Sequence, residues 1–173
     1  LEYIDHFPID IFQTGSGTST NMNMNEVISG IAKKDLKQKI HPNDDVNMSQ
    51  SSNDVIPTTI NIASLSMSKT LSTSLSFMCE SLNSKALNLA NIIKSGRTHL
   101  MDAVPISFEQ EINVWEEQVR ASKAQIDLSC EEISYLPIGG TAIGTGINAP
   151  KMFGKNVCNE LNKIYSEAKI KFK

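Results

Sequence analysis

Basic residues are scarce in this sequence. Its 16 Lys and Arg residues are outnumbered by 19 Asp and Glu residues, which gives a formal net charge of −3, and no basic run occurs. A protein that binds the phosphate backbone of a nucleic acid needs a basic excess or a basic patch. We therefore expect no nucleic acid among the partners of this chain.

Long apolar runs and paired cysteines are missing too. No stretch approaches the roughly 20 apolar residues that a membrane-spanning helix needs, so we expect no membrane partner. Cys79, Cys130 and Cys158 lie far apart and form no CxxC pair, which disfavours a zinc knuckle or a disulfide framework. We expect a reducing compartment, the cytoplasm first, with the mitochondrial matrix as the alternative.

The 173 residues would suffice for one domain with its own core. The chain begins on Leu1 without the basic and apolar segments of a signal peptide, and it stops at Lys173 inside a helical pattern. We therefore expect a piece of a longer protein. A complete small domain with trimmed ends is the alternative.

The composition changes near residue 50. Residues 1–50 are crowded with Gly, Ser, Thr, Asn, Asp and Pro, which is typical of loops, and a short apolar stripe predicts a helix only over 25–37. Over 51–173 apolar residues recur at helical spacing. We expect an all-α fold: a loop-rich part over 1–50, followed by a bundle of helices with very little strand.

A long helix is predicted from Asp54 to about Ile92, with Pro57 in its first turn. A helix of this length that is rich in serine needs partners on more than one side, which favours an oligomeric bundle. Its apolar stripe comprises Ile60, Ala63, Met67, Leu71, Leu75, Met78, Leu82 and Leu89.

Two further helices follow. Ser107 and Gln110 have the spacing of a capping box, which predicts a helix that starts at Ser107 and ends at Leu136-Pro137. Another helix is predicted to start near residues 148–150. The segments 94–105 and 136–148 are then connections.

Irregular segments hold the candidate chemistry. Thr14-Gly15-Ser16-Gly17-Thr18 combines glycines with hydroxyls, but it has neither the lysine of a P-loop nor the spacing of a dinucleotide fingerprint, and a surface turn is the plain alternative. His99 lies in a predicted loop, where a histidine is able to move protons near neutral pH. Residues 139–146 are a glycine-rich turn between helices.

A polar run precedes the long helix. Residues 41–45 and 49–54 contain His, Asn, Asp and Ser, and an anion is readily held at a helix N-terminus. Capping of the helix by Ser52, Asn53 or Asp54 is the structural alternative. A metal site formed by His41, Asp44 and Asp45 is a less favoured alternative, because no second histidine lies nearby. The residue types together favour a small carboxylate bound by neutral donors.

Four blocks of sequence now carry a resemblance: TGSGTSTNMNMNE, HPNDDVNMSQSSND, GRTHLMDAVP and GGTAIGTGIN. In this order and spacing they resemble the fumarase/aspartase superfamily over essentially the whole chain, and within it the class II fumarate hydratases. The pair Thr98-His99 is similar to fumarases, because aspartases carry Gln at the histidine position.

The resemblance implies a role for particular residues. His99 matches the histidine assigned to proton transfer. The residues that match substrate-binding positions are Ser16, Gly17, Thr18, Ser51, Ser52, Asn53 and Thr98. Those that match a second dicarboxylate site are His41, Pro42, Asn43 and Asp44. No metal or organic cofactor is implied.

The implied reaction is the reversible trans-addition of water to fumarate, giving (S)-malate. The implied assembly is a homotetramer with active sites shared between subunits, in which residues 1–50 end the N-terminal domain and 51–173 begin the helical bundle. Family members also carry a GSSxMPxKxN loop that this chain lacks, so we expect the chain alone to be inactive. The alternatives are an aspartase or another superfamily lyase, or a non-catalytic helical oligomerisation fragment.

Overall fold

The computed structural model describes residues 3–168 and 170–173, which form two compact units. Unit 1 comprises Leu1–Ser64 and Ser134–Lys173, and unit 2 comprises Leu65–Ile133. Helices dominate, as the sequence predicts, whereas the domain boundary near residue 50 stays a prediction. The described elements are η1 (Ile4–His6), α1 (Thr18–Leu36), η2 (Pro42–Val46), α2 (Ser52–Asn88), β1 (Ile93–Thr98), β2 (Met101–Ser107), α3 (Phe108–Ile133) and α4 (Phe153–Ile164).

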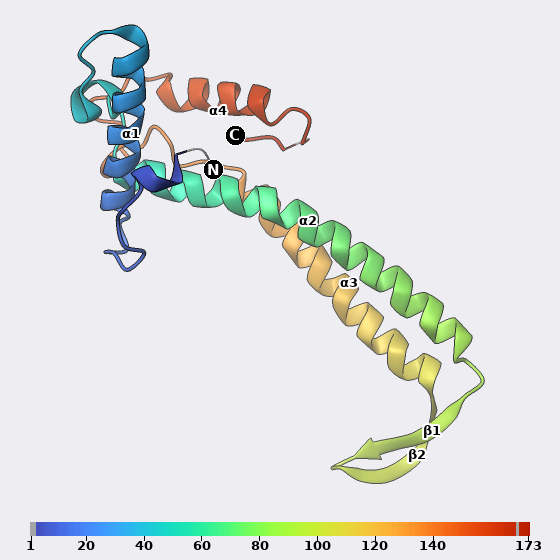
Figure 1. Cartoon of the computed structure of the whole chain (residues 1–173). Coiled ribbons are helices and arrows are strands. Elements are labelled where there is room, and N and C mark those ends of the chain that lie inside the picture. Colours follow the sequence, from blue (N-terminus) through green and yellow to red (C-terminus); the bar gives the residue numbers. More distant parts are fainter. Residues whose placement is uncertain (1–2, 169) are drawn as a thin grey trace. The chain divides into compact units, whose positions relative to one another are not determined.

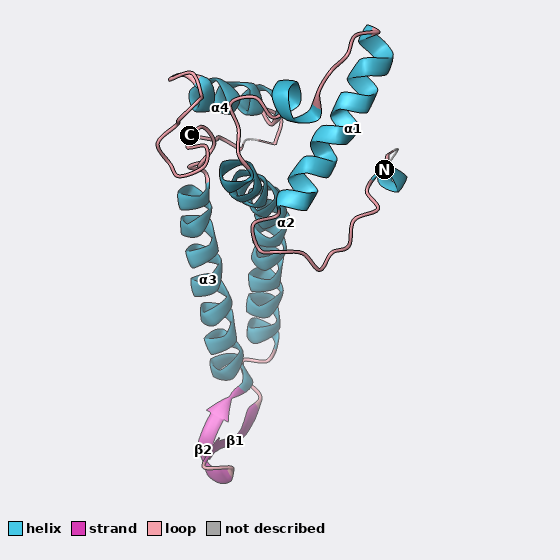
Figure 2. Cartoon of the chain, turned by 90° about the vertical axis from the view of Figure 1, so that its left-hand side faces the viewer, coloured by secondary structure: helices cyan, strands magenta, loops and turns pink. Residues whose placement is uncertain are grey.

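Unit 2 is a helical hairpin in which α2 and α3 lie side by side, with the strands at one end of the pair (Figure 1, Figure 2). On both helices the less exposed positions alternate at spacings of three and four, which is the pattern of coiled-coil packing. On α2 they are Leu65, Ser68, Ser72, Leu75, Cys79, Leu82 and Ala86. On α3 they are Ile112, Glu116, Val119, Lys123, Ile126, Cys130 and Ile133.

Asp127 of α3 is bonded both across the seam and along its own helix. Ser72 Oγ donates to Oδ1 of Asp127 at 2.9 Å, and Lys123 Nζ donates to the other carboxylate oxygen at 2.7 Å. The hydrogen bond from Lys123, and then that from Ser72, hold the pKa of Asp127 below its ordinary value. Ser72 therefore contributes a polar contact between α2 and α3, whereas Ser74 and Ser76 donate to carbonyls of α2 itself.

Much of the apolar stripe predicted for α2 is exposed. Met67 is 73% exposed, and Ile60, Leu71 and Met78 are exposed as well. Only Leu75 and Leu82 belong to both the stripe and the seam. Beside the seam, α2 thus carries apolar side chains that the described residues leave uncovered.

The capping box at the start of α3 is formed reciprocally. The backbone N–H of Gln110 donates to Ser107 Oγ at 3.1 Å, and the N–H of Ser107 donates to Gln110 Oε1 at 3.0 Å. The helix ends at Ile133, three residues before the predicted stop at Leu136.

We expect Ser107→Ala to lower the free energy of unfolding by about 1 kcal/mol, because the side-chain acceptor for one free N–H of the first turn is lost. Thermal or urea unfolding measures the change. Ser122→Ala is the matched control, because Ser122 Oγ donates to Gln118 O in the middle of the exposed helix surface. Equal losses in the two variants would contradict a capping role.

The connection between α2 and α3 contains two strands, which the sequence pattern does not predict. β1 and β2 pair antiparallel, with Thr98 opposite Met101, so that His99 and Leu100 form a two-residue turn. A register shift falls between Ser95 and Arg97, where a Cβ on Gly96 would lie 2.6 Å from Val104 O. The bulge therefore needs glycine.

Unit 1 contains α1, which begins at Thr18 rather than at the predicted residue 25. Its buried residues are polar: Asn21, Asn23, Asn25 and Ser29. Asn23 Nδ2 donates to His6 O at 2.9 Å, and Ser29 Oγ donates to Ile40 O at 2.8 Å. The spacing of apolar residues does not indicate a helix whose buried face consists of polar side chains.

The α4 helix, also in unit 1, begins at Phe153, a few residues later than predicted. Burial raises the pKa of the Cys158 thiol, so its reactive thiolate form is disfavoured. The buried Phe172 side chain meets Tyr165 edge-on, with ring centroids 5.4 Å apart. Among the described residues, no helix is long and apolar enough to cross a membrane.

Candidate functional site

The N-terminus of α2 holds one predicted group of substrate-binding residues. Ser51 is the N-cap: its Oγ accepts from the N–H of Asn53 at 3.2 Å, and its carbonyl accepts from Val55 at 3.0 Å. Asp54 Oδ1 reaches back to the N–H of Ser51 at 2.9 Å. The helix therefore starts two residues before Asp54, and the expected caps Ser52 and Asn53 are wrong, because both lie inside the first turn.

This earlier start moves Pro57 out of the first turn to the sixth position of α2. A residue at that position would otherwise donate its N–H to the carbonyl of Asn53, so proline removes one intrahelical bond. The prediction that Pro57 lies in the first turn of the helix is therefore wrong.

Asn53 is tied to the glycine-rich turn between α3 and α4. Its Nδ2 donates to Ala142 O at 2.8 Å, which fixes the amide plane and leaves Oδ1 and one N–H. Ser52 Oγ accepts from Asn21 Nδ2 at 3.1 Å. These contacts give both side chains defined positions at the positive end of the helix dipole, where a carboxylate is favoured.

The segment Ser16-Gly17-Thr18 lies against the same helix start. Gly17 caps α1 with a φ of +63°, and a Cβ there would lie 2.9 Å from Cγ1 of Ile56. Glycine is thus required both by the backbone and by the close approach. The Ser16 hydroxyl lies 3.1 Å from that of Thr14 and 3.2 Å from that of Thr18, and all three residues are exposed.

Asn47, which is not among the predicted site residues, joins these segments. Its Oδ1 accepts from Asn21 Nδ2 at 3.2 Å and from Asn25 Nδ2 at 2.9 Å. The alternating asparagines at positions 21, 23 and 25 are the signal that could have indicated buried hydrogen-bond partners, because buried amide groups are nearly always bonded. The network holds α1 to the chain just before α2.

We expect Asn47→Ala to lower the free energy of unfolding by about 1–3 kcal/mol, because two buried amide donors lose their acceptor. Chemical denaturation measures the loss. Asn43→Ala is the control: Asn43 Nδ2 bonds only the neighbouring Asp44 carboxylate at 3.2 Å on the surface, and a change of about 0.5 kcal/mol or less is expected. A similar small change for Asn47 would show that the network carries little energy.

The predicted second dicarboxylate site lies at η2. His41 Nδ1 accepts from the N–H of Asp44 at 3.1 Å, so this nitrogen carries no proton in that geometry, and its 3.3 Å approach to Asp44 Oδ2 is not a charged pair. The N–H of His41 donates to Asp45 Oδ2 at 2.7 Å. Pro42 opens the turn. The segment brings no permanent cation to an incoming dianion.

The metal alternative rested on the same segment. Within residues 3–168 and 170–173, no three His, Cys, Asp or Glu side chains gather as a metal site.

Thr98 and His99 belong to unit 2. Thr98 ends β1, and His99 and Leu100 have φ values of 50° and 63° in the hairpin turn. Two successive positive φ values are the pattern of a type I′ turn, which places both side chains at the exposed tip. The other three predicted groups, at residues 16–18, 41–44 and 51–53, all belong to unit 1.

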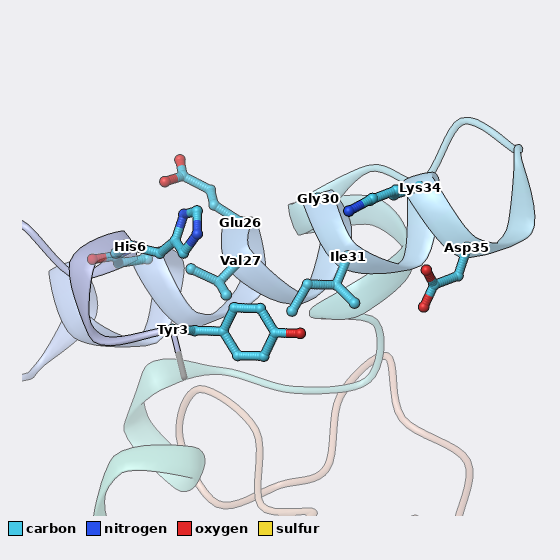
Figure 3. Close-up of a pocket in the computed structure, with 9 residues that line it drawn as sticks. Tyr3, His6, Glu26, Val27, Gly30, Ile31, Lys34 and Asp35 are labelled. Carbon is cyan, nitrogen blue, oxygen red and sulfur yellow. The ribbon is translucent and has the colours of Figure 1, made fainter. Parts of the chain in front are cut away.

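A pocket of about 510 Å³ lies beside α1 in unit 1, away from the predicted residues. Figure 3 shows the Tyr3 ring beside Val27 and Ile31, with His6 of η1 toward one end of the pocket and Lys34 of α1 toward the other. None of the predicted substrate-binding residues lines this pocket among the residues that the structure describes. It has no part in the candidate site.

The chain is similar to known proteins over most of its length. It is 47% identical over 163 residues to the class II fumarate hydratase of Xylella fastidiosa, and this match covers 94% of this chain and 34% of that protein. It is 50% identical over 157 residues to the class II fumarate hydratase of Mycobacterium tuberculosis, covering 90% and 33%. The crystal structure of recombinant class II fumarase from Schistosoma mansoni superposes with a TM-score of 0.87 at 38% identity, covering 96% of this chain and 36% of that one.

A family model described as Lyase matches residues 1–173, and the chain belongs to this lyase family. The similarity to class II fumarate hydratases agrees with the four blocks of sequence. The chain spans about a third of the length of the curated relatives that it matches.

Proposed function

We propose that the protein to which this chain belongs is a fumarate hydratase, which converts fumarate reversibly to (S)-malate. The observation that carries the proposal is the 47–50% identity to class II fumarate hydratases over nearly the whole chain. The hydroxyl and amide groups around the start of α2 support it, since they suit a small carboxylate.

In the proposed reaction, one carboxylate of fumarate binds at the start of α2. Ser51, Ser52 and Asn53 supply hydroxyl and amide donors there, and Ser16 and Thr18 add hydroxyls from the neighbouring segment. Helix N–H groups and their dipole favour the negative charge. Thr98 contacts a substrate carboxylate in the same proposal.

The chemical step adds water across the double bond. The water oxygen bonds to one alkene carbon and loses a proton to a base, with His99 assigned to polarise the water. The π electron pair moves to the other carbon and spreads into its carboxylate, and that carbon then takes a proton. Donors aimed at this carboxylate stabilise the intermediate more than the ground state, which lowers the barrier.

A homotetramer with shared active sites belongs to the same proposal. The uncovered face of α2, which includes Met67, Leu71 and Met78, supports it, because an exposed apolar stripe of this length requires a covering partner. A reducing compartment, the cytoplasm or the mitochondrial matrix, is proposed as well. It is supported by Cys79, Cys130 and Cys158, which are all free thiols.

The test uses the purified full-length protein. Addition of fumarate should cause a steady loss of the alkene absorbance, with malate as the product. No conversion of fumarate, together with release of ammonia from aspartate, would assign an aspartase instead. A solution mass measured on the same preparation gives the number of subunits. Together with the rate of fumarate conversion, it distinguishes an active tetramer from an assembly that has no turnover.

A further inference from the structure

Asp54 is a buried carboxylate to which the proposed reaction assigns no role. It is 2% exposed, and its two oxygens accept three backbone N–H groups. Oδ1 accepts from Ser51 at 2.9 Å, while Oδ2 accepts from Gly139 at 3.0 Å and from Thr141 at 2.8 Å. Among the described residues, N–H dipoles rather than a Lys or Arg side chain compensate this charge.

The turn that Asp54 binds has an unfavourable backbone conformation. Thr141 has a φ of +56°, which a β-branched residue rarely adopts, and its side chain is buried. Gly139 has a φ of +93°. Such a conformation persists only where surrounding contacts hold it, and the contact that reaches both residues is the carboxylate of Asp54.

The same turn returns to the candidate site. The residue after Thr141 is Ala142, and its carbonyl accepts from Asn53 Nδ2 at 2.8 Å. Asp54 follows Asn53 directly in the chain. The helix start and the turn are therefore joined twice, once through the Asp54 carboxylate and once through the Asn53 amide, although they lie 85 to 89 residues apart in sequence.

We propose that Asp54 is a positioning residue: by holding the turn at Gly139 and Thr141, its carboxylate orients the Asn53 amide toward the substrate. The role in binding rests on the proposed function, whereas the tether itself does not. Both carboxylate oxygens are needed, because one faces the helix start and the other faces the turn. Asparagine keeps the size of the side chain but offers one acceptor oxygen, so Asp54→Asn breaks one side of the tether and turns an N–H₂ group toward donors.

The kinetic test compares Asp54→Asn with wild type in the full-length protein. We expect KM for fumarate to rise about tenfold with kcat changed by less than about threefold, because a contact made equally in ground and transition states is weakened. Asp5→Asn, the same change at an exposed carboxylate of unit 1, should leave both constants unchanged. A fall in kcat at constant KM is the pattern of a smaller folded fraction, and it would overturn the positioning role.

Hydrogen exchange with residue resolution tests the tether without using activity. In wild type, the amides of Gly139 and Thr141 should exchange at least about tenfold more slowly than those of the exposed neighbours Ala142 and Ile143. This comparison uses wild type alone, so it does not depend on whether the variant folds. In Asp54→Asn this protection should be lost. Equal exchange of these amides in wild type would overturn the proposal, and so would lost protection with unchanged KM. If wild type does not convert fumarate, the proposed function fails while the exchange result still decides whether Asp54 holds the turn.

Discussion

Replacement of His99 by Asn in the full-length protein is expected to lower kcat for fumarate hydration by about 10²–10⁴-fold, the usual contribution of a positioned acid–base group. The loss follows from removal of the imidazole rather than from damage to the hairpin. His99 has a φ of 50°, and asparagine is among the residues that adopt this left-handed conformation most readily. Steady-state rates with fumarate and with malate measure the effect in both directions.

Leu100→Asn is the matched control for this variant. Leu100 is the other residue of the turn, with a φ of 63° and 97% of its surface exposed. The same substitution there should leave kcat within about twofold of wild type and should not destabilise the hairpin. An unchanged rate for His99→Asn would remove the proton-transfer role, and an equal loss in both variants would point to the turn itself.

Asn53→Asp is expected to raise KM for fumarate at least about a hundredfold. A donor is replaced by a negative charge that faces a dianionic substrate, and hydrogen bonds to charged groups are among the stronger ones. The substitution also removes the donor to Ala142 O. Initial rates over a wide range of fumarate concentration measure the change.

Asn61→Asp controls for the structural part of that change. Asn61 lies two turns further along α2, and its Nδ2 donates to Tyr135 O at 3.5 Å, so the variant also replaces an amide that bonds a backbone carbonyl beyond α3. Thermal unfolding should be affected in both variants, but KM only in Asn53→Asp. A KM for Asn53→Asp equal to that of wild type would remove this residue from the substrate site.

The parts of the fold that depend on neighbours in sequence were predicted well. The Ser107–Gln110 capping box marked the start of α3, because both partners lie within one helical turn. The length of α2 followed from apolar residues at helical spacing. The ends were less certain: α2 begins at Ser52, because Ser51 and Asp54 satisfy one another across the first turn.

Two elements escaped prediction for different physical reasons. The first half of α1 was not expected to be helical, because Asn21 and Asn25 are buried by hydrogen bonds to Asn47 rather than by apolar contact. The β1–β2 hairpin was not expected because its strands are short and His99-Leu100 is not a usual turn pair. In both cases the secondary structure depends on a hydrogen-bonding partner that the local sequence pattern does not reveal.

The sequence by itself determined the family and the residue types of the candidate site, and its scarcity of basic charge is the ground for expecting no nucleic-acid partner. It also named the glycine-rich turn at 139–146 without assigning it a purpose. Only the tertiary structure joined that turn to the start of α2, through Asp54 and Asn53. A hydrogen bond between residues 85 or more positions apart leaves no periodic trace in the chain, so the pairing becomes visible only when the folded backbone brings donor and acceptor together.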